Sequence, residues 1–342
     1  MKPILILIFA NIATAGTIYN VTDLGTAGGS TAETFLLNDK GAVLFDSAGT
    51  ASGINNAGEI SGTQYIGGQP YATAWTGGEA QTVAGAGSYA MAIDARGDVA
   101  GMLTASGEGH AFVTQNGAVE DLGTLPGGSW GAAYAIDNSG TAAGYGEIGG
   151  AMRGFLWSPR TGYTILGTLG GANSYAMALD NSGEAAGGAQ TTNGYMHAAV
   201  WSHGAIQDLG TLGGPSSFAY GLNGSGEAVG DSSLAASPET HAFLFDSGAM
   251  IDLNNLIDPD SGWTLTEAFA INSVGQILGT GTFQGDGRAF LLTPSAEPFA
   301  ASLNSGPAPV PEPPAWPLML LGLASGLFAR RFGFVRSCRP RF

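Results

Sequence analysis

The feature that most constrains this chain is a short turn motif, an Asx residue with glycine three positions later, which recurs at near-regular intervals. The apolar residue before each Asx is, in sequence order, Ile54, Ile93, Ile136, Leu179, Leu222 and Ile271. The three inner steps are 43 residues each, and the outer steps are 39 and 49. A fixed period of about 40–45 residues is the signature of a repeat architecture. The chain is therefore predicted to consist of structurally equivalent units.

Each unit contains four short apolar segments separated by turn residues. In the second unit these segments are residues 88–94, 98–103, 110–114 and 119–123. Each has the length of a β-strand, and none has the 3.6-residue period of an amphipathic helix. The Asx side chain can bond the backbone two residues on, and glycine accepts the positive φ that closes a hairpin. Four strands in a repeat of this length predict an all-β fold, a β-propeller of four-stranded blades.

The number of blades is less constrained than their type. Six third segments match the six turn motifs, and they begin at Tyr71, His110, Arg153, His197, His241 and Arg288. The last unit has no fourth segment, and Tyr19–Gly25 supplies one, which predicts a ring closed by the N-terminal strand. A further degenerate hairpin spans Leu36–Phe45. We expect six blades with an extra hairpin, and the alternative is seven blades with one incomplete.

Composition fits an exported β protein and limits its partners. Glycine accounts for 57 of 342 residues and recurs at one position of the second segment, where it predicts close backbone approach: Gly101, Gly144, Gly187, Gly230 and Gly279. Between the two chain ends only five cationic residues face all 27 acidic ones. A repeat region with this excess of negative charge repels nucleic-acid phosphates. Cys338 is the only cysteine, so no intrachain disulfide is possible.

The two chain ends have the patterns of targeting segments. Residues 1–15 combine Lys2, an apolar stretch and the small residues Ala13 and Ala15, which predicts a signal peptide and a mature chain from residue 16. The repeat pattern ends at residue 294, and residues 295–309 form a Pro/Ala-rich linker. Residues 310–342 then carry Val310, Pro311, Glu312 and Pro313, an apolar segment 315–329, and the basic pair Arg330 and Arg331.

Two family resemblances rest on these motifs. The third segments HAFVT, RGFLW, HAAVW, HAFLF and RAFLL, with the DLGTLGG elements at Asp121, Leu166 and Asp208, resemble the HAF family of bacterial extracellular repeats. That resemblance implies no reaction. The C-terminal order of Pro-Glu-Pro, membrane segment and arginines is similar to the PEP-CTERM sorting signal. It implies export in a Gram-negative bacterium that makes exopolysaccharide, transient anchoring in the inner membrane, and cleavage by an exosortase. The tail beyond Arg331 is longer than is usual for that signal.

Candidate metal and catalytic residues are few. His110, His197 and His241 occupy one repeat position, but Tyr71, Arg153 and Arg288 share it, and arginine does not ligate metals. A flat polar group that caps the strand and bonds a neighbouring loop explains all three residue types. The turn from Asp258 to Gly262 lacks the alternating oxygen ligands of a calcium loop. We expect no metal, no cofactor and no catalytic residue.

Two tryptophans stand outside the repeated positions. Trp130 and Trp263 are candidates for stacking on a sugar, whereas Trp75, Trp157 and Trp201 end third segments and are expected to pack between blades. The chain is predicted to be a non-catalytic cell-surface or matrix protein that binds exopolysaccharide. Two alternatives stay open: a propeller glycosidase or lyase with clustered acids, and a purely structural surface protein.

Overall fold

The structure is a computed structural model that describes residues 18–26, 34–46, 50–104 and 107–295, all within one compact unit. In this part of the chain, the secondary structure is strand apart from one 3-10 helix, η1 (Leu253–Asn255). The predicted all-β repeat architecture is confirmed. The helix predicted at 315–329 lies outside the described residues.

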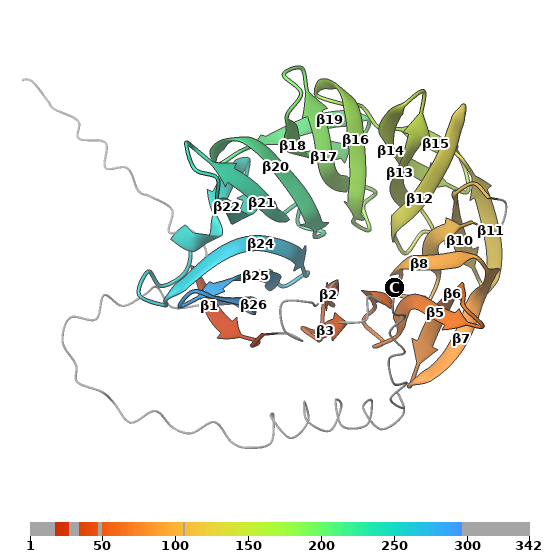
Figure 1. The fold of residues 1–342 in the computed structure, drawn as a ribbon, viewed down its shortest axis with the longest axis horizontal. Coiled ribbons are helices and arrows are strands. Elements are labelled where there is room, and N and C mark those ends of the chain that lie inside the picture. Colours follow the sequence, from red (N-terminus) through yellow and green to blue (C-terminus); the bar gives the residue numbers. More distant parts are fainter. Residues whose placement is uncertain (1–17, 27–33, 47–49, 105–106, 296–342) are drawn as a thin grey trace, which may run out of the picture. The chain divides into compact units, whose positions relative to one another are not determined.

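Six four-stranded antiparallel sheets follow one another along the chain (Figure 1). We number them one to six. Sheet one contains β4 (Ala51–Ile54), β5 (Ile60–Ile66), β6 (Gln69–Thr76) and β7 (Glu79–Ala86). Sheet two contains β8 (Ser88–Ile93), β9 (Val99–Leu103), β10 (His110–Gln115) and β11 (Ala118–Gly123). Sheet three contains β12 (Gly128–Ile136), β13 (Ala142–Ile148), β14 (Ala151–Ser158) and β15 (Gly162–Ile165).

The remaining three sheets repeat the same order. Sheet four contains β16 (Gly170–Leu179), β17 (Ala185–Thr191), β18 (Met196–Ser202) and β19 (Ala205–Gly210). Sheet five contains β20 (Gly213–Leu222), β21 (Ala228–Leu234), β22 (Thr240–Asp246) and β23 (Ala249–Asp252). Sheet six contains β24 (Trp263–Ile271), β25 (Ile277–Phe283), β26 (Asp286–Ser295) and, as its fourth strand, β1 (Ile18–Asp23).

The N-terminal strand completes the last sheet, as predicted. β1 pairs antiparallel with β26 from Ile18 opposite Ser295 to Asp23 opposite Phe290. Tyr19 is 1% exposed and belongs to the hydrophobic cluster of sheets five and six. Two segments more than 260 residues apart in sequence therefore share one sheet, and β26 presents no open edge.

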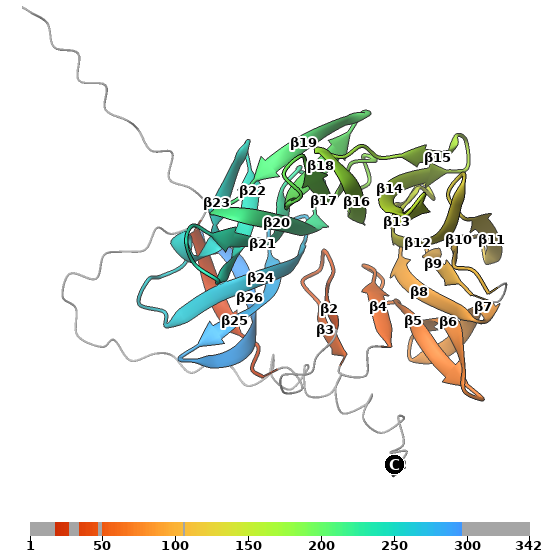
Figure 2. The ribbon, with the colours of Figure 1, turned by 45° about the horizontal axis from the view of Figure 1, so that its top comes forward.

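The degenerate hairpin forms a two-stranded sheet of β2 (Thr34–Leu37) and β3 (Val43–Asp46). Its turn bonds sheet six on one side and sheet one on the other. Asn272 donates from Nδ2 to the Asn38 carbonyl at 3.1 Å, and Asn38 donates from Nδ2 to the Asn55 carbonyl at 2.9 Å. The hairpin therefore lies between the last and first four-stranded sheets (Figure 2).

The hydrophobic core is divided into clusters that lie between successive sheets. One cluster joins Ala111 and Val113 of sheet two to Phe155 and Trp157 of sheet three. Another joins sheets three and four and includes Trp201, at 4% exposure. The prediction that Trp157 and Trp201 pack between blades is confirmed. Buried apolar residues from neighbouring sheets therefore share one cluster, and the clusters join the sheets face to face.

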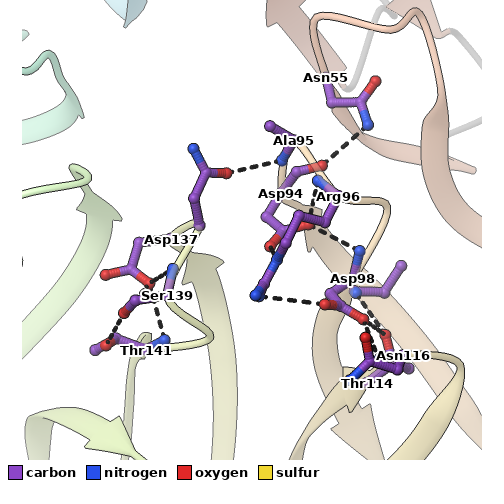
Figure 3. A network of polar contacts seen from close by, with 12 residues as sticks. Asn55, Asp94, Ala95, Arg96, Asp98, Thr114, Asn116, Asp137, Ser139 and Thr141 are labelled. Carbon is purple, nitrogen blue, oxygen red and sulfur yellow. Dashed lines mark hydrogen bonds and ion pairs between the residues drawn. The ribbon is translucent and has the colours of Figure 1, made fainter.

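The recurring turn is built around a buried Asx oxygen. In sheet two, Asp94 Oδ1 accepts hydrogen bonds from the backbone N–H of Arg96 and of Asp98, both at 2.8 Å (Figure 3). Arg96 adds ion pairs to Asp94 at 3.0 Å and Asp98 at 3.2 Å. The first Asx in all seven turns makes the same two backbone bonds and is 3–6% exposed: Asn38, Asn55, Asp94, Asp137, Asp180, Asn223 and Asn272.

The glycine of each second strand makes room for its neighbours. The first strand carries a register shift, such as that between Ala219 and Gly221, opposite this glycine. A Cβ on Gly230 would lie 1.8 Å from the Phe218 carbonyl oxygen and 2.8 Å from Cε1 of Phe243. In every sheet, the equivalent carbonyl oxygen would lie 1.8–2.1 Å from a Cβ on the second-strand glycine. These glycines are Gly62, Gly101, Gly144, Gly187, Gly230 and Gly279. The predicted close backbone approach is confirmed.

This geometry predicts a large effect of a single methyl group. Gly230→Ala should lower the free energy of unfolding by about 3 kcal/mol or more, because neither the Phe218 carbonyl nor the packed Phe243 ring can move away. The matched control is Gly224→Ala in the adjoining turn, where nothing lies within 4 Å of the new Cβ and φ is not positive. Urea unfolding measures both. Equal effects of the two substitutions would contradict the packing described here.

Candidate functional site

The three repeated histidines do not converge. Nδ1 of His110 lies 3.0 Å from Asp121, that of His197 lies 3.0 Å from Asp208, and that of His241 lies 2.6 Å from Asp252. Each pair joins the third and fourth strands of its own sheet. The third-strand side chain therefore bonds the Asp of the DLG element, or of its equivalent in sheet five, on the next strand, rather than a loop.

Arg153 and Arg288, which occupy the repeat position of the histidines, differ in their hydrogen-bond and ion-pair partners. Arg288 makes an ion pair of 2.6 Å with Asp23, so β1 brings the partner that the last unit lacks. In sheet three, Ile165 stands opposite Phe155, where Asp121 stands opposite Phe112 in sheet two. Arg153 accordingly has no carboxylate partner among the residues that the structure describes, and within them one of its Nη atoms is buried without a hydrogen bond.

The structure places Trp130 and Trp263 on different sheets, in different surroundings. Trp130, in β12, packs over Gly109 of sheet two, where a Cβ would lie 2.2 Å from its Cδ1 atom. Its ring also lies 5.6 Å from that of Tyr145. Trp130 thus covers the neighbouring sheet and remains half-buried. Its surroundings are those of a packing residue at the edge of an aromatic surface.

Trp263 lines an open cavity of about 330 Å³. The cavity lies between β1 and the beginning of β24, and its other lining residues are Tyr19, Asn20, Val21, Asp258 and Ser261. Behind it, the indole packs against Phe283 at 5.4 Å and edge-on against Phe290 at 6.0 Å. Asp258 belongs to the turn weighed above as a calcium loop, and its Oδ1 accepts the Asp260 N–H at 2.9 Å, as in an ordinary Asx turn.

A second surface follows from the register shifts in the first strands. The first strands of successive sheets contact one another (Figure 1). In each, one residue falls in the shift and has no partner on the second strand, and a bulge of this kind re-aims a side chain. These residues are half-buried, and three of them are aromatic: Ser52, Met91, Tyr134, Met177, Tyr220 and Phe269.

Aromatic rings form a continuous series along these strands. Centroids 4.8–6.2 Å apart connect it from sheet three through sheets four, five and six to the β2–β3 hairpin. We call this series the aromatic row, and its members are Trp130, Tyr134, Tyr145, Tyr175, Phe218, Tyr220, Phe269 and Phe35. All are half-buried, so each packs on its neighbours and keeps part of its ring at the surface.

Two carboxylates lie beside this row. Burial raises the pKa of Asp231, which is hydrogen-bonded to Tyr220. Burial also raises the pKa of Glu267, and the charge of Asp231 raises it further. Tyr220 has a raised pKa from burial and from the Asp231 charge. The groups therefore lie close enough to interact electrostatically, from strands β20, β21 and β24.

The sequence marks these carboxylates by their departure from the repeat, which shared motifs alone do not reveal. After the repeated glycine of the second strand, the other units have Thr63, Met102, Tyr145, Gly188 and Thr280, and only sheet five has an acid there. Glu267 likewise stands where Tyr89, Tyr175 and Phe218 occur in other units. Asp231 and Glu267 can be identified because they depart from the repeat at positions that packing does not fix.

The remaining predictions concern metal ligands, a membrane-spanning helix and the sorting residues. In the described part of the chain, no group of three or more His, Cys, Asp or Glu side chains is arranged to hold a metal ion. That part also contains no helix long and apolar enough to cross a membrane. The sorting residues lie outside the described residues: Ala13, Ala15, Val310, Pro311, Glu312, Pro313, Arg330 and Arg331.

No protein-family model and no curated protein sequence matches this chain. Solved structures do resemble it. The similarity to TolB from Acinetobacter baumannii covers 77% of this chain and 54% of TolB, with 11% identity and a TM-score of 0.40. The β-propeller domain of the Trilobed protease from Pyrococcus furiosus gives 73% and 84% coverage, 8% identity and a TM-score of 0.47.

A gluconolactonase from Xanthomonas campestris is similar over 81% of this chain and 95% of its own, with 12% identity and a TM-score of 0.41. The chain spans about half the length of TolB. At these identities the similarities concern the fold and assign no activity. The repeated four-stranded sheets are those of a β-propeller-like repeat protein.

The raised pKa of Glu267 predicts how its removal affects stability. A carboxyl whose pKa is raised on folding favours the folded state while protonated, and this contribution is lost as pH rises through the folded-state pKa. Glu267→Gln should therefore raise the melting temperature at pH 7.5 relative to the wild type. The gain should vanish at a pH below the ordinary Glu value of about 4.3.

The matched control is Glu147, whose carboxyl pKa is shifted in the opposite direction. Glu147 accepts hydrogen bonds from the Ser129 hydroxyl and the Gly150 N–H, which lower the pKa of its carboxyl. Glu147→Gln should not stabilise the protein at pH 7.5. Calorimetric melting of both variants across this pH range measures the difference, and a destabilised Glu267→Gln variant at neutral pH would contradict the electrostatic account.

Proposed function

We propose that this chain is an exported, non-catalytic surface or matrix protein whose β-propeller binds exopolysaccharide. The observation that carries this proposal is the cavity beside Trp263. An indole forms one wall, and a carboxylate, an amide and a hydroxyl come from Asp258, Asn20 and Ser261. Small-ligand sites combine aromatic walls with a few polar groups that fix orientation. A sugar ring offers both an apolar C–H face and hydroxyls, so it suits this lining.

The cavity depends on the docking of the N-terminal strand β1 beside the turn that precedes β24. Asn20 and Val21 come from β1, whereas Asp258 and Ser261 precede β24 in the last sheet. Tyr19 is anchored by its N–H, which donates to the Leu256 carbonyl at 2.8 Å. A site assembled from docked, hydrogen-bonded segments is preorganised, which reduces the entropic cost of binding.

The cellular address of this function rests on the sequence. The signal at residues 1–15 and the Pro-Glu-Pro segment at 310–313 favour export followed by exosortase processing, with the segment 315–329 held transiently in the inner membrane. The shortage of cations among the repeats disfavours nucleic acid as a partner. Export of a body with this surface places its cavity in contact with extracellular polymer.

We further propose that the propeller is a closed ring of seven positions, six of them filled by four-stranded blades and the seventh by the β2–β3 hairpin. Support comes from hydrogen bonds between successive Asx turns. The second Asx of one turn accepts the N–H of the preceding turn, as Asn138 does from Ala95 and Asn181 from Asn138, both at 3.0 Å. Where the first Asx is Asn, its Nδ2 donates to the carbonyl of the next turn, as from Asn55 to Asp94 and from Asn223 to Asn272. Among the described turns, only the step from Asp180 to Asn223 has neither kind of bond.

One observation favours the enzymatic alternative, a glycosidase. Asp231 and Glu267 are two interacting carboxylates, and a raised pKa is what a general acid requires. Both acids of a glycosidase flank the scissile bond. Release of reducing ends from the polymer by the wild type, and its loss in Glu267→Gln, would establish that alternative in place of the binding role.

The binding role predicts a specific effect at Trp263. Trp263→Ala should weaken retention on exopolysaccharide from the source organism by roughly fivefold or more, since removal of a buried aromatic anchor costs over about 1 kcal/mol. Tyr195→Ala is the control, because Tyr195 is 51% exposed on the hairpin between β17 and β18 and lines no part of the cavity. Co-sedimentation measures both. Full retention by Trp263→Ala would remove the cavity as the site, and no retention of the wild type would remove the binding role.

Ring closure predicts a contrast between two isosteric exchanges. Asn272→Asp keeps the two bonds that its Oδ1 accepts within the turn but loses the Nδ2 donor to the Asn38 carbonyl. The free energy of unfolding should fall by about 1–3 kcal/mol, because a buried acceptor is left unpaired. Asp180→Asn, at the step without a bond, should be neutral or stabilising. Urea unfolding tests both, and an unaffected Asn272→Asp variant would contradict closure through the hairpin.

A further inference from the structure

The aromatic row and the carboxylates beside it form a surface that the Trp263 cavity does not use. The rings connect through Tyr220, which contacts Phe218 at 5.1 Å and Phe269 at 6.0 Å and is hydrogen-bonded to Asp231. Asp231 stands opposite Phe218 in the β20–β21 register, so the two side chains share a face. Packing alone does not require an acid in this position, because other units place Met, Tyr, Gly or Thr there.

Among the described residues, no cation compensates the charge of these carboxylates. The ion pairs of the described residues involve Asp94, Asp98, Asp121, Asp208, Asp252 and Asp23. Within that part of the chain, neither Asp231 nor Glu267 forms an ion pair, although both are half-buried. Two partly desolvated, mutually repelling carboxylates next to aromatic faces create an environment that favours a cation.

We propose that this surface binds a positively charged amino-sugar segment of polysaccharide, with sugar rings against the aromatic row and an ammonium group between Asp231 and Glu267. The inference rests on the proposed function, since it names the class of polymer. It places the ligand on the first strands of sheets three to six and the β2–β3 hairpin, apart from the residues that line the Trp263 cavity.

The chemistry distinguishes this ligand from two others. A neutral or N-acetylated sugar can stack on the rings but leaves both carboxylates unpaired. A metal ion needs more oxygen, nitrogen or sulfur ligands than two carboxylates, and the described residues contain no group of three candidate ligands. An alkyl-ammonium group instead combines hydrogen bonds to carboxylates with attraction to the faces of Tyr220 and its neighbours.

The test uses two probes and the full chain. The probes are a β-1,4-linked glucosamine hexasaccharide and its fully N-acetylated counterpart, compared by calorimetry at pH 7 and constant ionic strength. The isosteric double variant Asp231→Asn/Glu267→Gln removes both charges and keeps hydrogen-bonding groups in place. A charge-matched control, Glu120→Gln/Glu239→Gln, removes two charges from exposed positions. Trp263→Ala controls for the cavity.

We expect the wild type to bind the amine hexasaccharide at least tenfold more tightly than the acetylated one. The Asp231/Glu267 variant should lose that preference, while the charge-matched control and Trp263→Ala should keep it. Equal weakening by the charge-matched control would show general attraction to an acidic protein and overturn the inference. Retention of the source polysaccharide without any amine preference would overturn the inference alone, and loss of both would overturn the proposed function as well.

Discussion

The structure depends on one buried interaction, an Asx side-chain oxygen that accepts two backbone N–H groups of its own hairpin turn. It is made seven times, by residues no more than 6% exposed. Backbone groups buried at the junction of sheets require partners, and this oxygen provides one for the two N–H groups that the tight turn leaves without a strand partner. Where the residue is Asn, its Nδ2 is free to bond the next turn, as Asn55 does to the Asp94 carbonyl at 2.9 Å. The same side chain therefore shapes a turn and, as Asn, joins units.

A second constraint follows from the shift in the first strand. The shift brings a carbonyl over the second strand, and only glycine leaves space for it together with the third-strand Phe ring. Two sequence features that look independent, the strand glycine and the HAF phenylalanine, are thus parts of one packing unit. This unit also explains why Ala199 is tolerated in sheet four. Gly187 there still accommodates the Tyr175 carbonyl, and no ring fills the remaining space.

Much of this fold could be predicted from the sequence, because its repeated residues report a repeated geometry. The turn motif indicated the repeated units, and the four apolar segments of each unit indicated its strands. The missing fourth segment of the last unit indicated that β1 pairs with β26. The place of the Leu36–Phe45 hairpin could not be predicted, because it depends on distant side-chain bonds from Asn272 to Asn38 and from Asn38 to Asn55. The cavity at Trp263 depends equally on which strand docks beside it, which periodicity does not reveal.

The candidate binding residues were harder to predict for a physical reason. Repeat analysis weights the positions that units share, and those positions are fixed by packing. A bulged residue has no partner on the second strand, so the framework accepts Ser52, Met91 or Tyr220 there with the same backbone. Function is free to vary at these positions and at the paired positions beside them. Glu267, which stands opposite Thr280 next to the bulge, is an acid placed there even though its charge costs stability. In a repeat protein of this type, a polar departure beside a bulge is therefore stronger evidence for a binding surface than a polar residue that every unit repeats.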